Sequence, residues 1–437
     1  LMKVMNYNFF RIYLFYEIGG DLISLFKVIS QKTIVIVMTF SMIGFLVVGC
    51  GGEKEQLKIA FLADFSGPFK EYGPVIQTGV ELAIDHINAA GGINGFDVLL
   101  VTGDSGLDAT KATEEARRLI DIEGAHGIVG PLASTATLAV SNSVTSERKI
   151  PLISPSASSA SLTNAKDNGY LFRSTVSDSA QGVILADLAK SEGYRDVGIL
   201  YENSPYGQGL AEVFKAAFEK IGGKATIASY EAKAASYLPE LKALSMNGSE
   251  VLVAVGYPTQ AAIFINEALE NKIYDKFLFV DGTKSTDLIK AVGTDVLEGM
   301  KGTAVGVGPV SAATKAWDAA YKTKNGYLPK IGYVKEAYDA TICLALAAQS
   351  VGSTDGAKIA IALSKVCGGD GEKTTPGAAG VKSALTLVSD GKAVNFDGAA
   401  TSLDWNANGD IANGYIDIWQ YIDGNIKTLE SKPFTLN

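Results

Sequence analysis

The sequence predicts an α/β fold in which two consecutive modules each build a parallel sheet covered by helices. Three observations support this prediction. From Leu57 onward, short runs of β-branched residues alternate with amphipathic stretches of helical spacing, the pattern of strand–helix units. The same alternation begins again after Arg173. The chain of 437 residues is also too long for one hydrophobic core, because domains usually hold about 100 to 200 residues.

The first module contains four predicted strands with helices between them. Its clearest helix begins at Pro74, and Val80 and Ile87 fall on one apolar face of it. In order, the predicted elements are strand 57–62, helix 74–90, strand 98–102, helix 109–123, strand 127–129, helix 135–147 and strand 151–154.

The second module repeats this order at a similar length. Its predicted elements are helix 181–191, strand 196–201, helix 207–221, strand 225–230, helix 238–246, strand 250–255, helix 259–270 and strand 277–280. No segment rich in Pro and Ser separates the modules, so we expect them to lie against each other with short hinge crossings. A long helix over 334–350 and turn-rich β-structure over 393–429 follow, and their order alone assigns them to neither module.

The first fifty residues are typical of an export leader. Lys27 and Lys32 precede sixteen uncharged residues, a run that is short for a membrane-spanning helix of about 20 apolar residues. The run ends in Val47-Val48-Gly49-Cys50, which resembles the bacterial lipobox, so Cys50 is the predicted lipidation site and the first residue of the mature chain. An uncleaved membrane anchor is the alternative, and in both cases the chain from residue 51 lies outside the cell. Residues 1–26 fit neither interpretation, and a start assigned too far upstream would explain them.

Composition and charge narrow the class of function. Loss of residues 1–49 removes four basic and two acidic side chains, so the net charge moves from −9 to −11 and no basic run remains for nucleic acid. The two histidines, His86 and His126, are predicted to be structural. The motifs G-x-x-x-x-G-K-[ST], G-x-S-x-G, H-E-x-x-H and C-x-x-C do not occur. We therefore expect neither an enzyme, nor a cofactor, nor a nucleic-acid partner.

One segment resembles the opening of a calcium-binding loop. Asp404, Asn406 and Asn408 carry oxygen ligands at alternate positions, and a glycine fills the sixth place. Tyr415 stands where the twelfth-position acid is required. We interpret the segment as a turn shaped by Asn, Gly and Asp, and we expect no metal.

Small hydroxyl residues gather where two predicted strands of the first module end. In open α/β sheets, ligands bind beyond the carboxyl ends of the strands, where helix N-termini present N–H groups. The third strand leads to Ser134 and Thr135, one of which should cap the next helix, and the fourth leads to Ser156 and Ser158. Hydroxyls at a helix start suit a carboxylate, although Ser134 serving only as a cap is the alternative.

The second module carries an acidic side chain at the edge that faces these serines. Asp281 directly follows the strand 277–280 and offers a carboxylate to an ammonium group, unless it only shapes a turn. Tyr72, Tyr206 and Tyr257 lie at predicted strand–helix junctions, where their rings can enclose an apolar side chain.

Two cysteines, Cys343 and Cys367, follow Cys50 in the sequence. An oxidising location permits them to pair, but the sequence does not say whether their Cα atoms come within bonding range. A disulfide and two separate thiols both stay open at this point.

Five short stretches, in a specific order and spacing, match a known family: ADFSGP at 63–68, DHINAAGGI at 85–93, ISPSAS at 153–158, YGQG at 206–209 and LEGM at 297–300. From about Leu57 to its C-terminus the chain resembles the type I periplasmic solute-binding proteins of branched-chain amino acid transport, the leucine/isoleucine/valine-binding proteins. The resemblance implies two Rossmann-like lobes joined by a three-crossing hinge. It also implies this division: leader 1–49, tether 50–56, first lobe 57–175 and 304–395, second lobe 176–303, and 396–437 as second lobe and hinge return.

The resemblance further implies a ligand site made of seven side chains. The serines would hold the carboxylate and ammonium of an amino acid, the acidic residue would pair with the ammonium, and the tyrosines would flank the ligand. Carried over by position, these are Tyr72, Ser134, Ser156, Ser158, Tyr206, Tyr257 and Asp281.

The chain departs from the family pattern at three places. Asp281 stands where the leucine-type proteins carry Glu, and Tyr72 stands where Trp is common, so the side-chain specificity stays open. The first-lobe disulfide of the family is missing, because the segment 104–108 has no cysteine and Ala133 replaces its partner.

By this resemblance, the expected function is that of an extracytoplasmic substrate-binding lipoprotein of an ABC transporter. It would capture a branched-chain or other small amino acid by lobe closure, on the outer face of the membrane, with the permease subunits as partners. A binding protein or sensor for short amides or urea is the alternative within the same fold. An enzyme is the alternative of another class.

Overall fold

The structure, a computed structural model, describes residues 55–436, so the leader and the predicted lipidation site Cys50 lie outside the described residues. The fold is α/β with two large sheets, which confirms the predicted fold class. We call the five-stranded sheet with the helices packed on it the first lobe, and the seven-stranded sheet with its helices the second lobe. The residue boundaries given above for each domain stay a prediction.

The sheet of the first lobe is wholly parallel, in the order β2-β1-β3-β4-β5. Its strands are β1 (Lys58–Ala63), β2 (Leu99–Asp104), β3 (Gly127–Val129), β4 (Leu152–Ser154) and β5 (Leu171–Arg173). Successive side chains of a strand point to opposite faces, so Ile59 and Phe61 of β1 enter one core while Ala60 and Leu62 enter another. Both faces of this sheet are therefore buried under helices.

The sheet of the second lobe has the order β14-β13-β10-β9-β8-β6-β7. Its parallel strands are β6 (Asp196–Glu202), β7 (Lys224–Tyr230), β8 (Val251–Val255), β9 (Phe277–Phe279) and β10 (Lys301–Gly306). The antiparallel hairpin β13 (Asn413–Ile422) and β14 (Asn425–Thr435) extends the sheet at one edge, so the C-terminal tail belongs to the second lobe. A small parallel pair, β11 (Glu372–Thr374) and β12 (Val394–Phe396), lies apart from both sheets.

Helices cover both sheets. Those of the first lobe are α2 (Tyr72–Ala89), α3 (Ala109–Asp121), α4 (Ser134–Val140), α5 (Ser146–Arg148), α12 (Ala312–Asn325), α13 (Val334–Val351), α14 (Gly356–Val366) and α15 (Ala378–Ser389). Those of the second lobe are α6 (Asp178–Ser191), α7 (Pro205–Lys220), α8 (Leu238–Ser245), α9 (Pro258–Glu270), α10 (Thr286–Val292) and α11 (Thr294–Leu297). Within the described range 55–436, no helix is both long and apolar enough to cross a membrane.

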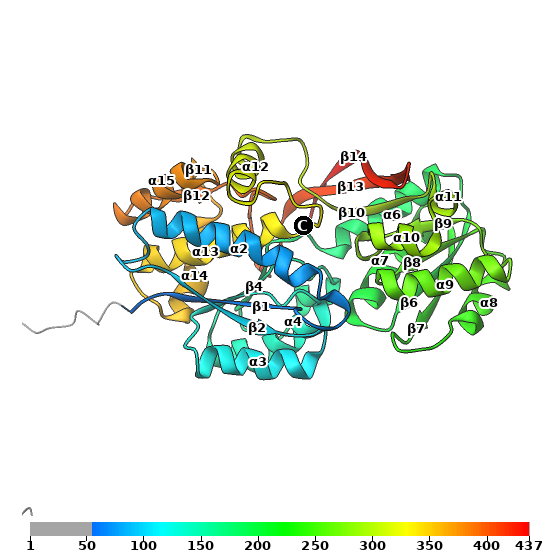
Figure 1. Ribbon diagram of the computed structural model, residues 1–437, viewed down its shortest axis with the longest axis horizontal. Coiled ribbons are helices and arrows are strands. Elements are labelled where there is room, and N and C mark those ends of the chain that lie inside the picture. Colours follow the sequence, from blue (N-terminus) through cyan, green and yellow to red (C-terminus); the bar gives the residue numbers. More distant parts are fainter. Residues whose placement is uncertain (1–54, 437) are drawn as a thin grey trace, which may run out of the picture. The chain divides into compact units, whose positions relative to one another are not determined.

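Helices α2 and α13, far apart in the sequence, lie side by side over the first sheet (Figure 1). Gly79 of α2 makes this approach possible, because a Cβ atom there would lie only 2.2 Å from the carbonyl oxygen of Val334. Cys343 of α13 and Cys367 after α14 form a disulfide with a Cα–Cα distance of 6.0 Å. Of the two alternatives that the sequence left open for these cysteines, the structure therefore shows the disulfide.

The chain passes between the lobes three times: between β5 and α6, between β10 and α12, and before β13. These crossings match the three-crossing hinge implied by the resemblance. Because the first lobe is completed only by α12 to α15, the long helix that element order alone left unassigned belongs to the first lobe, as the resemblance implied.

Several sequence predictions of local structure were wrong or incomplete. Strand β5 was missed because it has only three residues and depends on pairing with β4. The predicted helix 135–147 is interrupted by a π-helical stretch, Ser141–Thr145, which apolar spacing does not reveal. Neither Ser134 nor Thr135 caps the helix that follows β3. The cap position is Ala133, and the Ser134 hydroxyl instead accepts a hydrogen bond from another loop.

Candidate functional site

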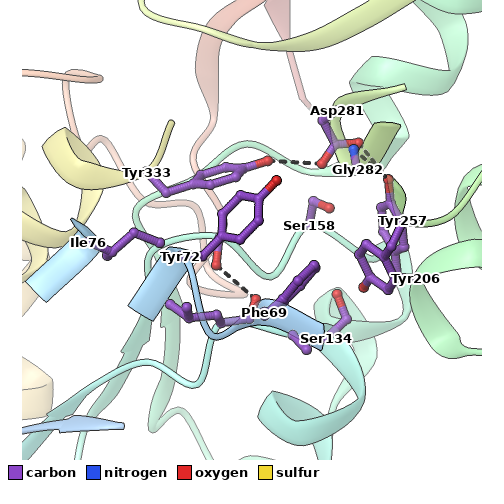
Figure 2. A pocket seen from close by; sticks show the side chains of 13 residues that line it. Phe69, Tyr72, Ile76, Ser134, Ser158, Tyr206, Tyr257, Asp281, Gly282 and Tyr333 are labelled. Carbon is purple, nitrogen blue, oxygen red and sulfur yellow. Dashed lines mark hydrogen bonds between the residues drawn. The ribbon is translucent and has the colours of Figure 1, made fainter. Parts of the chain in front are cut away.

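One pocket lies where strands of both sheets end, and it is lined by both lobes (Figure 2). The space between its lining atoms measures about 510 Å³, part of it open to solvent. The structure brings all seven predicted site residues together in its wall: Tyr72, Ser134, Ser156, Ser158, Tyr206, Tyr257 and Asp281. Their role in binding a ligand stays a prediction.

The first lobe supplies a wall of hydroxyl groups from the loops after β3 and β4. The Ser134 hydroxyl oxygen accepts the backbone N–H of Ser159 at 3.2 Å, so its own proton is left for a ligand. The Ser156 hydroxyl donates to the carbonyl oxygen of Leu132 at 2.8 Å, so its oxygen is left to accept. One serine is thus arranged to donate and the other to accept.

The second lobe supplies the carboxylate of Asp281, which begins the 3-10 turn η4 (Asp281–Thr283) after β9. Its Oδ1 accepts from the Tyr206 hydroxyl at 2.7 Å and from Gln181 Nε2 at 2.9 Å, and its Oδ2 accepts from the Tyr333 hydroxyl at 2.9 Å. Gly282 follows, and a Cβ there would lie 2.3 Å from the carbonyl oxygen of Gly256. These neutral donors fix the carboxylate in place without cancelling its charge.

Tyr333 is a site residue that sequence reasoning missed. It precedes α13 in the first lobe, yet its hydroxyl reaches Asp281 of the second lobe (Figure 2). Its backbone has φ of 72°, in the left-handed region that non-glycine residues seldom adopt. No strand end or helix periodicity marks this position, so no local pattern in the sequence points to it.

Aromatic rings form the sides of the pocket. Tyr206 and Tyr257 of the second lobe stack with ring centroids 5.5 Å apart. Phe69 of the first lobe, which was also missed, packs edge-on against Tyr257 at 4.5 Å and lies 5.0 Å from Tyr72. The rings therefore meet across the two lobes and offer an apolar surface to a ligand side chain.

Burial controls the ionisation of groups around Asp281. Burial, and then the charge of Asp281, raises the pKa of the Tyr206 and Tyr333 hydroxyls well above the ordinary value, so both stay neutral donors. Behind the serine wall, Asp178 begins α6 and donates its backbone N–H to the Ser158 carbonyl oxygen at 2.8 Å. Burial, and then the charge of Asp281, also raises the pKa of Asp178.

The histidines and the calcium-like segment lie outside the pocket wall. His86 Nδ1 is 2.8 Å from the Tyr338 hydroxyl, and His126 Nδ1 accepts the Lys58 backbone N–H at 3.0 Å. In the segment 404–410, Asp410 forms a buried ion pair with Arg173. Among residues 55–436, no group of three His, Cys, Asp or Glu side chains is placed to hold a metal.

Two carboxylates hold the loop after β2, the segment in which the family pattern has a cysteine and this chain has none. Asp64 Oδ1 accepts from the Ser105 hydroxyl at 2.8 Å and from the Leu107 backbone N–H at 2.5 Å. Asp104 pairs with Lys111 and accepts further backbone N–H groups. The loop after β2 is therefore held by hydrogen bonds and an ion pair.

Comparison with known proteins agrees with this architecture. Residues 56–402 match a family model described as periplasmic binding protein. A leucine-, isoleucine-, valine-, threonine- and alanine-binding protein from Pseudomonas aeruginosa is 27% identical over 314 residues, covering 71% of this chain and 82% of the relative.

Two solved structures share the fold. A leucine-binding protein from Thermotoga maritima has a TM-score of 0.72 at 23% identity and covers 86% of this chain and 98% of its own. A branched-chain amino acid transporter substrate-binding protein from Streptococcus pneumoniae, in complex with isoleucine, has a TM-score of 0.69 at 24% identity and covers 87% of this chain and 100% of its own. The chain therefore belongs to the periplasmic binding protein family, and it is an extracytoplasmic solute-binding protein of type I fold rather than an enzyme.

Proposed function

We propose that the chain captures a small amino acid, branched-chain or of similar size, by closing its two lobes around it. The observation that carries this proposal is the placement of charge in the pocket. Asp281 is the one formally charged side chain in the pocket wall that residues 55–436 form, and it lies across the pocket from Ser134 (Figure 2). A ligand with an ammonium at one end and a hydrogen-bond acceptor at the other fits this arrangement.

The carboxylate end is proposed to lie at the start of α4. Ser134 is the first residue of this helix, and Ala133 before it also lines the pocket. The first N–H groups of a helix have no partner within the helix and favour a negative charge. Together with the Ser134 hydroxyl proton, they would satisfy a carboxylate without a cationic side chain.

The ammonium end is proposed to lie between Asp281 and the Ser156 hydroxyl oxygen. An ammonium group has three donors and needs acceptors at close range, because an unpaired buried charge is costly. Asp281 belongs to the second lobe and Ser156 to the first, so an ammonium that contacts both would favour the closed arrangement. The names of the relatives, which bind leucine, isoleucine, valine, threonine or alanine, agree with this ligand class.

Delivery to an ABC transporter permease and anchoring through a lipid on Cys50 complete the proposal. Both rest on the sequence: the lipobox-like Val47-Val48-Gly49-Cys50 and the family resemblance. Metabolic labelling with a radioactive fatty acid tests the anchor. Label is expected on the parent protein and not on Cys50→Ser, and an unlabelled parent would contradict it.

Ligand analogues that lack one end test the site directly by calorimetry. L-leucine is compared with 4-methylpentanoate, which lacks the ammonium, and with 3-methylbutylamine, which lacks the carboxylate. Asp281→Ala should weaken leucine binding by about 10- to 150-fold, since a hydrogen bond to a charged group contributes roughly 1.5–3 kcal/mol and each 1.4 kcal/mol is tenfold. Binding of 4-methylpentanoate should not fall.

Acetamide and urea are tested beside leucine for the alternative ligand class. Tight binding of either amide, with no binding of any amino acid, would refute the amino-acid proposal. Leucine binding by Asp281→Ala that equals the parent would refute the site.

A further inference from the structure

Arg173, at the end of β5, is a charged side chain that the ligand site does not use directly. Its side chain is 1% exposed and lies at the first crossing between the lobes. Its Nε donates to Asp410 Oδ1 at 2.8 Å, and its Nη2 donates to the Thr163 hydroxyl at 3.0 Å. Thr163, which is partly buried, in turn donates to Asp410 Oδ2 at 2.7 Å and closes a ring of hydrogen bonds.

Asp410 belongs to the segment that resembles a calcium-binding loop, just before the third crossing. Within this segment, Asn406 Oδ1 accepts the backbone N–H of Asp410 at 3.1 Å. The segment also contacts the backbone of Arg173. Trp405 Nε1 donates to the Arg173 carbonyl oxygen at 2.6 Å, and the Arg173 backbone N–H donates to the Gly409 carbonyl oxygen at 2.9 Å. The segment 404–410 thus holds the Asp410 carboxylate beside the first crossing between the lobes.

The other side of Arg173 reaches the wall of the ligand pocket. Its Nη1 donates to the carbonyl oxygens of Ser158 and Ser159, both at 2.9 Å. The Ser159 N–H donates to the Ser134 hydroxyl, and the Ser159 hydroxyl donates to the Pro205 carbonyl oxygen at 2.7 Å in the second lobe. One guanidinium therefore connects two crossings with the serines of the pocket and, through Ser159, with the facing lobe.

A buried ion pair is a poor choice for stability alone. Removing two charges from water is costly, and well-packed apolar residues often serve as well or better. A planar guanidinium does, however, donate in several fixed directions at once, which neither Lys nor an apolar side chain can do. The geometry thus favours a role in holding several backbone groups in one arrangement.

We propose that Arg173, with Asp410 as its counterion, is a positioning residue that fixes the serine loop 156–159 of the ligand site to the hinge. The proposal rests on the proposed function, because the serines matter only if they contact the ligand. Loss of the pair would loosen the loop and weaken ligand binding, even where the global stability is preserved.

The test removes both charges together in Arg173→Met/Asp410→Asn, so that no uncompensated charge stays buried. A matched control carries the same changes in a partly exposed pair, Arg148→Met/Asp121→Asn. Thermal unfolding, hydrogen exchange of peptides covering 155–161, and calorimetry with L-leucine are compared with the parent. If the double variant does not fold, Thr163→Val removes the hydroxyl that bridges Arg173 and Asp410.

The expected result is at least tenfold faster exchange in 155–161 and about tenfold weaker leucine binding, for the hinge variant and not for the control. Exchange and affinity equal to those of the parent, in a folded variant, would overturn the proposal. The exchange measurement needs no ligand. If the parent binds no amino acid, the proposed function fails while the exchange still decides whether Arg173 fixes the loop.

Discussion

Replacement of Tyr333 by phenylalanine tests how the site couples the ligand to lobe closure. The Tyr333 hydroxyl, from the first lobe, donates to Asp281 Oδ2 of the second lobe at 2.9 Å. The change removes one oxygen atom and keeps the ring in the pocket wall. It therefore removes a hydrogen bond between the lobes and little else.

The expected magnitude follows from the charge of the acceptor. A hydrogen bond to a charged group contributes roughly 1.5–3 kcal/mol, equivalent to about 10- to 150-fold in an equilibrium constant. Asp281 keeps its donors Tyr206 and Gln181, so we expect the lower end, about a tenfold shift from closed to open. Apparent leucine affinity should fall by a similar factor where the closed state is the minor one. The left-handed backbone of Tyr333, a strained conformation, is consistent with a loop held for this contact.

Tyr206→Phe is the matched control, because Tyr206 donates to the same carboxylate from within the second lobe. Both variants lose one hydroxyl bound to Asp281, but only Tyr333→Phe loses a contact between lobes. Calorimetry gives the affinity, and fluorescence energy transfer between one dye on each lobe gives the closed fraction over a leucine titration.

The closed fraction is compared between variants at equal leucine occupancy, which the calorimetric affinity provides. At equal occupancy, Tyr333→Phe should show a smaller closed fraction than the parent, and Tyr206→Phe should not. The reasoning is refuted if Tyr333→Phe closes at the same leucine concentration as the parent. It is refuted equally if Tyr206→Phe shifts closure to the same extent.

Three further predictions concern stability. Burial raises the pKa of Glu336 from its ordinary value of 4.5 to about 7, so the fold loses stability as pH rises from about 4.5 to about 7. In urea unfolding, Glu336→Gln should therefore add on the order of 2–3 kcal/mol at pH 8 and little at pH 4.5. Replacing Cys343 and Cys367 by alanine should lower the free energy of unfolding by about 3 kcal/mol, because their cross-link closes a loop over a sequence separation of 24, with leucine affinity unchanged. Gly79→Ala should cost about 1–3 kcal/mol, since its Cβ would collide with the Val334 carbonyl oxygen.

Two of these predictions have a control of the same residue type. Glu270 is exposed, so Glu270→Gln should change the free energy of unfolding little, and a gain equal to that of Glu336→Gln would contradict the burial argument. A Cβ on Gly332 would meet no atom within 4 Å, so Gly332→Ala should be tolerated. Equal unfolding free energies for Gly79→Ala and the parent would show that α2 and α13 can separate at little cost. Loss of leucine binding on removal of the disulfide would show that α13 and α14 act on the site.

The sequence was informative where local pattern and strand order decide the outcome. Strand β3 lies at the predicted residues 127–129, and Ser134, Ser156, Tyr206, Tyr257 and Asp281 meet because parallel strands present their carboxyl ends at one edge. The same reasoning failed for the cap of α4. A local rule assigned Ser134 to its own helix, whereas the loop carrying Ser159 competes for that hydroxyl.

By itself, the sequence determined the α/β class, the two modules and the residue types of the pocket, because hydrophobic periodicity and strand-end position are properties of neighbouring residues. Tertiary structure alone decided which side chains from distant segments of the chain contact each other. It placed Tyr333 against Asp281, joined Cys343 to Cys367, and gave Arg173 its counterion 237 residues away in Asp410. Such contacts depend on how lobes and crossings pack, and no local spacing encodes that packing.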